Sequence, residues 1–61
     1  MNDDLIAAID AQADWAEKAK PRPTDLDALA AFLNQVFYET SIEEIEKELV
    51  VVWGSRRLPI R

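Results

Sequence analysis

The sequence predicts a small all-α domain of three helices followed by an extended basic tail. Apolar residues recur at helical spacing in three segments, and capping residues precede each segment. Pro21, Pro23 and the single glycine, Gly54, stand where these patterns stop. We therefore expect helices over about residues 2–20, 24–39 and 41–53, a three-helix domain spanning 1–54, and a tail at 55–61.

The first predicted helix carries an apolar stripe made mostly of alanine. Asn2 is a suitable N-cap, and Asp3 and Asp4 follow where the helix dipole favours negative charge. The stripe consists of Leu5, Ile9, Gln12, Ala16 and Ala19, flanked by Ala8, Ala13 and Trp15. Alanine allows close approach to a neighbouring helix but supplies less burial energy than leucine would.

The second predicted helix is the most apolar and is expected to form the centre of the core. Thr24 is the expected cap, with Asp27 three residues later in a weaker form of the capping box. Apolar residues cover a broad arc of about 160° on the helical wheel. They are Leu26, Leu29, Ala30, Phe32, Leu33, Val36 and Phe37. We expect Phe32, Val36 and Phe37 to pack inside the domain.

The third predicted helix has a clear beginning and an ambiguous end. Ser41 and Glu44 form a capping box, and Ile42, Ile45, Leu49, Val52 and Trp53 share one face. One reading ends the helix with Gly54 as its C-terminal cap. The other places a short β segment within 49–60, because residues 50–52 are β-branched and residues 58–60 could pair with them. Pro59 weighs against that second strand, because proline lacks a donor for the ladder.

Composition argues against catalysis and against a bound cofactor or metal. The 61 residues include no cysteine and no histidine, which leaves no disulfide, no thiolate site and no ordinary zinc site. Ser41 and Thr24 are explained as caps, and Ser55 is expected to lie in a turn. Asp10, Asp14 and Glu17 share a helix face, but one exposed row does not converge on a cation. We expect a protein that is not an enzyme.

Charge divides the chain into an acidic body and a basic end. All 12 Asp and Glu lie in residues 1–48 with four of the 7 Lys and Arg, a net of −8, whereas residues 49–61 carry three arginines and no acid, a net of +3. The apolar and basic end is therefore expected to dock. It could fold back so that Arg56 and Arg57 neutralise the body, hook onto a partner through Leu58 and Ile60, or remain a disordered terminus.

These features predict a small acidic protein–protein interaction module, such as an adaptor, an inhibitor or an accessory subunit, acting through helix faces and its C-terminal tail. A core this small is marginal without disulfides or metals, so association with another chain, as a homo-oligomer or in a larger complex, is the remaining staple. Trp and Arg are enriched among interface hot spots, although either tryptophan could instead fill the core. The candidate contact residues are Trp15, Trp53, Arg56, Arg57, Leu58 and Ile60.

An alternative function is an acidic inhibitor that imitates nucleic acid and blocks a basic groove. Its charges would come from Asp10, Asp14 and Glu17 on the first helix, and its binding would weaken steeply with salt. Direct binding to nucleic acid is not expected, because the third helix is rich in glutamate. No stretch approaches the ~20 apolar residues of a membrane span, and the acidic start does not resemble a secretory signal. We expect a cytoplasmic protein.

Overall fold

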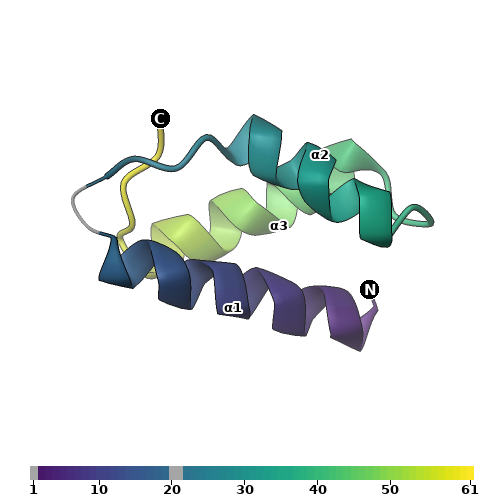
Figure 1. Ribbon diagram of the computed structural model, residues 1–61, viewed down its shortest axis with the longest axis horizontal. Coiled ribbons are helices and arrows are strands. Elements are labelled where there is room, and N and C mark those ends of the chain that lie inside the picture. Colours follow the sequence, from purple (N-terminus) through teal and green to yellow (C-terminus); the bar gives the residue numbers. More distant parts are fainter. Residues whose placement is uncertain (1, 20–21) are drawn as a thin grey trace.

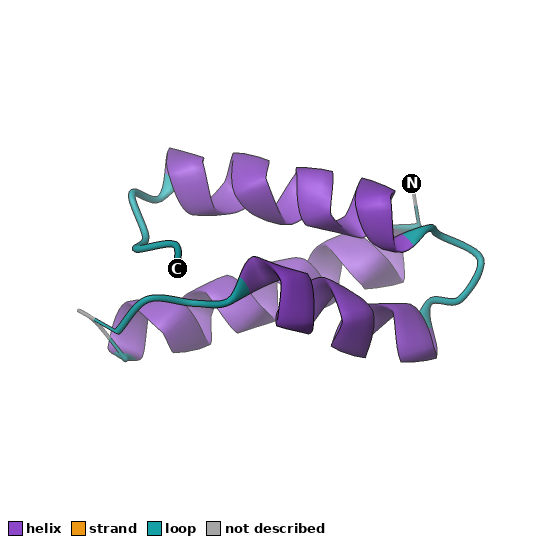
Figure 2. Cartoon of the chain, turned by 90° about the horizontal axis from the view of Figure 1, so that it is seen from above, coloured by secondary structure: helices purple, strands orange, loops and turns teal. Residues whose placement is uncertain are grey.

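The computed structural model, which describes residues 2–19 and 22–61, confirms a small all-α domain of three helices. They are α1 (Asp3–Lys18), α2 (Leu26–Val36) and α3 (Ile42–Ser55). α1 and α2 lie side by side in one layer, and α3 lies behind them (Figure 1). The view from above shows the same two layers (Figure 2). Both α1 and α2 pack on α3, whereas they make few contacts with each other.

Side-chain caps fix the beginnings of α1 and α3 as the sequence predicts. The side-chain oxygen of Asn2 accepts a hydrogen bond of 2.8 Å from the backbone N–H of Asp4. The Ser41 hydroxyl oxygen accepts one of 3.2 Å from the N–H of Glu44. Each cap satisfies one of the N–H groups that have no partner within the helix.

The predicted cap of α2 is wrong by one residue. Asp25, not Thr24, accepts the hydrogen bond from the N–H of Ala28, at 3.2 Å. The backbone of Thr24 is held in extended form by the C-terminal tail: its N–H donates to the carbonyl of Pro59 (3.1 Å), and its carbonyl accepts from Arg61 (2.9 Å). The tail thereby sets where α2 can begin.

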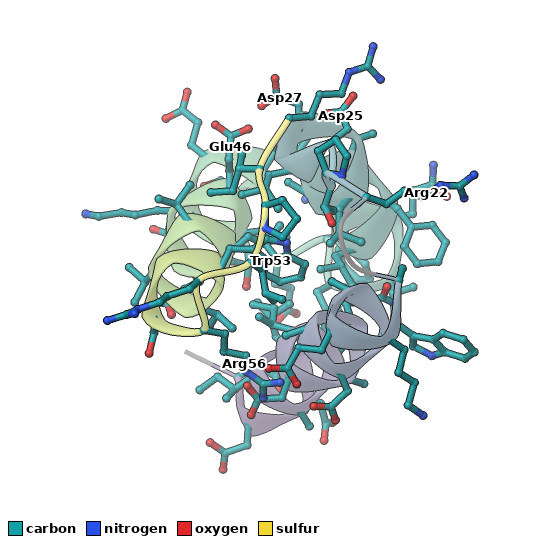
Figure 3. All side chains as sticks on the ribbon, turned by 90° about the vertical axis from the view of Figure 1, so that its left-hand side faces the viewer. Arg22, Asp25, Asp27, Glu46, Trp53 and Arg56 are labelled. Atoms are coloured by element: carbon teal, nitrogen blue, oxygen red, sulfur yellow. The ribbon has the colours of Figure 1, made fainter. Side chains whose placement is uncertain are left out.

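The core lies between the layers and is centred on Trp53, which is fully buried among the three helices (Figure 3). The remaining buried residues are Leu5, Ile9, Ala13 and Ala16 of α1, Leu26, Ala30 and Leu33 of α2, Ile45 and Leu49 of α3, and Leu58 of the tail. Three of them are alanines. α1 contributes two large buried side chains, Leu5 and Ile9, together with two of these alanines.

Two residues of α2 that were expected in the core are exposed. Phe32 is 55% exposed and Val36 is 63% exposed, whereas Phe37 is partly buried. The apolar arc of α2 is wider than the strip that α3 can cover. Because α1 does not close against α2, the side of the arc that carries Phe32 and Val36 faces solvent.

The C-terminal end of α3 differs from the predicted glycine cap. The helix runs through Gly54 to Ser55, with Arg56 as the cap and Arg57 in the left-handed region at φ 56°. The N–H of Leu58 donates to the carbonyl of Trp53 (2.9 Å), and that of Arg57 donates to Gly54 (3.2 Å). These two hydrogen bonds form a Schellman motif, in which Arg57 holds the position that glycine usually takes.

The predicted alternative of a β segment within 49–60 is not formed. Residues 49–55 are helical, and in the described residues the segment makes one isolated parallel bridge, between Ile60 and Thr24. Ile45, Leu49 and Trp53 enter the core from one face of the continuous helix α3.

Candidate functional site

Two of the predicted contact residues are part of the core. Trp53 is fully buried and Leu58 is 5% exposed. The Schellman motif brings them together, since an apolar contact between these two positions commonly accompanies it. Their predicted role in binding a partner stays untested, but neither side chain reaches the surface of this structure.

Arg56 joins the two sets of residues that the sequence singled out. Its guanidinium, 29% exposed, lies 2.7 Å from a carboxylate oxygen of Asp14, 3.5 Å from Glu17 and 3.8 Å from Asp10. The hydrogen bond to Asp14 and the three negative charges raise the pKa of Arg56 above its ordinary value, against a smaller opposing effect of desolvation. The acidic row of α1 is therefore a binding site for the chain's own tail (Figure 3).

The other three predicted contact residues are exposed but do not lie together. Arg57 occupies the left-handed position that ends α3, and Ile60, 47% exposed, forms the bridge to Thr24 beside the start of α2. Trp15 is 68% exposed on α1, with the Lys18 ammonium 5.7 Å from the ring centre. This cation–π contact places the ammonium over the face of the ring, and most of the Trp15 surface remains in water.

Several exposed apolar side chains lie across the two helices of the front layer. We call this surface the α1–α2 face, and it consists of Ala8, Gln12 and Trp15 of α1, its C-terminal cap Ala19, and Leu29, Phe32 and Val36 of α2. Helical geometry aligns each set on the side turned away from α3. Each of its three largest exposed side chains, Trp15, Phe32 and Val36, is more than half exposed.

A shallow cavity of about 240 Å³ opens in this face between α1 and α2. Its described lining is Gln12, Trp15, Ala16, Ala19, Thr24, Leu29 and Trp53, a set without a charged side chain. Trp53 contributes to the lining from the core, and its indole nitrogen has no acceptor among the described residues. The cavity follows from small residues: alanines on α1 leave space where larger side chains would meet α2.

Sequence reasoning placed Trp15 at the surface edge of its helix but missed Phe32 and Val36. The width of the apolar arc of α2 could have indicated that some of its residues would be exposed. An arc of about 160° exceeds what one helix neighbour covers, so some of its residues need a second neighbour. Which residues these are depends on how α1 is placed, and the α2 sequence does not contain that information.

A second, weaker feature is a pair of carboxyl groups between α2 and α3. A hydrogen bond with Asp27, followed by desolvation and by repulsion from Asp27, Asp25 and Glu43, raises the pKa of Glu46. In the part of the chain that the structure describes, no group of three metal-ligating side chains is formed, and no helix is long and apolar enough to cross a membrane.

Comparison of the chain with known protein families, with curated proteins and with solved structures gives no match. Function is therefore inferred from the surface itself.

Proposed function

We propose that the protein is a small interaction module, an adaptor or accessory subunit, that binds another polypeptide through the α1–α2 face. The observation that carries the proposal is the exposure of Trp15, Phe32 and Val36 on one apolar surface of a chain with a small core. Exposed apolar patches rimmed by polar residues mark interaction sites, and the largest such patch on a monomer is often functional.

The chemistry of the face suits a protein partner. Trp15 offers the residue type most enriched among interface hot spots, and it stands beside a cavity that can receive an apolar side chain. The absence of charge in the described lining means that a partner can cover it without burying an unpaired ion. A polar rim is supplied by Lys18 and by Gln12.

The tail supports this function by holding the scaffold rather than by reaching for a partner. Leu58 is buried, Arg56 is engaged by α1, and the backbone near Ile60 is bonded to Thr24. The same contacts weigh against the nucleic-acid mimic, because Arg56 sits on the acidic row that would have to face a basic groove.

The test compares two exposed apolar positions that lie on different sides of the molecule. Phe32→Glu places a charge in the α1–α2 face, and Val51→Glu places one on the outer side of α3, where Val51 is 60% exposed. Tagged wild-type, F32E and V51E chains are used for affinity purification from the native source, after circular dichroism confirms that each is folded.

We expect a partner polypeptide that is recovered with wild type and V51E and is lost with F32E. Equal recovery with both variants would contradict the proposed face. Loss with V51E alone would move the contact to α3.

A further inference from the structure

We propose that the partner covering the α1–α2 face is the same face of a second copy of this chain. The two copies are related by a two-fold axis through the face, so that α1 and α2 of both form a four-helix bundle with each α3 on the outside. This inference rests on the proposed function and deepens it by naming the partner.

The layered arrangement makes such pairing possible. α3 covers one side of the layer formed by α1 and α2, and the other side has no cover among the described residues (Figures 1 and 2). A face that pairs with itself must offer both protruding and hollow parts. Here Trp15 and Phe32 protrude, and the cavity between α1 and α2 lies beside them.

Small residues allow the two layers to approach closely. The α1 side of the face carries Ala8 and Ala19, and Ala28 is exposed at the start of α2. Alanine-lined helices pack at the short end of the interaxial range, about 8 Å, at which large side chains from one copy reach the hollows of the other. The alanines on this side of the molecule thus fit the interior of a bundle.

The distribution of charge favours a second copy over a charged partner. The chain has a net charge of −5, but the residues that define the face carry none of it. Asp10 and Asp14 turn towards Arg56, and Asp27 and Glu46 face each other between α2 and α3. Asp4 and Asp25 stand one helical turn before Ala8 and Leu29, at the edge of the face. Two copies can therefore meet across these uncharged residues, with Asp4 and Asp25 at the edge of the contact. A basic partner would find no counter-charge among the residues of the face itself.

The available area is consistent with a reversible dimer. Trp15, Phe32 and Val36 together expose roughly 300–400 Å² of apolar surface, taking about 150–250 Å² for a whole aromatic side chain. A standard interface buries about 800 Å² on each partner, so these three residues supply nearly half. Leu29, Gln12 and the alanines of the face supply more.

The experiment measures molar mass by sedimentation equilibrium of wild type, F32E and V51E over roughly a hundredfold range of concentration. We expect wild type and V51E to rise from the 6.9 kDa chain mass towards twice that value. F32E should remain near 6.9 kDa, or dimerise at least about tenfold more weakly. Higher salt should strengthen the dimer, because it screens the repulsion between two chains of net charge −5.

Tryptophan fluorescence provides a second readout in the same samples. Trp53 is already buried in the single chain, so a blue shift that develops with concentration reports the burial of Trp15. We expect this shift in wild type and V51E and its absence in F32E.

Wild type that stays at 6.9 kDa throughout overturns the dimer, as does an equal effect of F32E and V51E on the mass. Neither result removes the proposed function. That function fails only if no polypeptide, neither a second copy of this chain nor a different one, is recovered through the α1–α2 face in the affinity purification.

Discussion

Two apolar regions of this chain differ in burial: one, on α2, faces solvent, and the other, at the basic C-terminal end, is part of the core. The α2 residues Phe32 and Val36 belong to the most apolar helix, yet they face solvent. Trp53 and Leu58 belong to the basic end that resembles a docking segment, yet they complete the core. The difference shows that apolar character identifies residues that need a neighbour, while the position of the neighbouring element decides which of them obtain one.

Replacing the two aromatic residues tests this comparison with the largest expected effect. Trp53→Ala should cost about 3–5 kcal/mol, since it empties the centre of the core. The free energy of unfolding of a domain of this size is only about 3–9 kcal/mol in total, so the variant should lose its cooperative unfolding transition in urea. Phe32→Ala should cost less than about 1 kcal/mol, measured at low protein concentration. Similar losses of stability for both variants would contradict this difference in burial.

Leu58 and Ile60 provide the same comparison within the tail. Leu58→Ala should lower the free energy of unfolding by about 2–4 kcal/mol, because the side chain is 5% exposed against Trp53. Ile60→Ala should lower it by less than about 1 kcal/mol, because nearly half of that side chain is in water. Denaturation in urea distinguishes the two, and equal effects would mean that the tail does not pack as described.

The C-terminal end of α3 departs from the usual pattern, because glycine lies inside the helix and arginine holds the left-handed position that follows it. Reversing either choice should stabilise the fold. Gly54→Ala should stabilise by about 1 kcal/mol, because Gly54 is helical and an added methyl group meets nothing within 4 Å. Arg57→Gly should stabilise by up to about 1 kcal/mol by relieving the left-handed residue. Arg57→Ala is the control and should bring no gain, since alanine keeps the strain. Thermal unfolding measures all three.

The carboxyl pair gives the smallest expected effect, through pH. Because the pKa of Glu46 is raised in the folded state, the folded chain binds a proton more readily than the unfolded chain. Stability from this group is therefore present at acid pH and is lost as pH rises through the raised pKa. Glu46→Gln should raise the unfolding temperature slightly at neutral pH and remove this part of the pH dependence. A lower unfolding temperature at neutral pH would contradict repulsion from Asp27.

Local signals predicted most of the fold. The caps at Asn2 and Ser41 involve residues two or three apart, so the sequence around them contains the whole interaction. The cap of α2 and the end of α3 were missed because they depend on contacts across the chain. Thr24 is held by Pro59 and Arg61, and Arg57 tolerates its conformation because Leu58 packs on the core.

The candidate surface was only partly predictable for the same reason. Trp15 was identified because it lies at the edge of a helix stripe, a property of one helix. The α1–α2 face requires the arrangement of two helices around α3, and the alanines that open its cavity also fit the interior of an ordinary helix pair. The contact of Arg56 with Asp14 was one of three open alternatives, since charge alone does not give its direction.

The bridge between Thr24 and Ile60 has a consequence for how the molecule opens. It ties the C-terminus to the start of α2, so that α2, α3 and the tail form a ring closed by backbone hydrogen bonds. α1 stands outside this ring and is held by a small apolar stripe and by Arg56. Amide hydrogen exchange should therefore release the protons of α1 in a separate, lower-energy opening, while those of α3 exchange only when the whole chain unfolds.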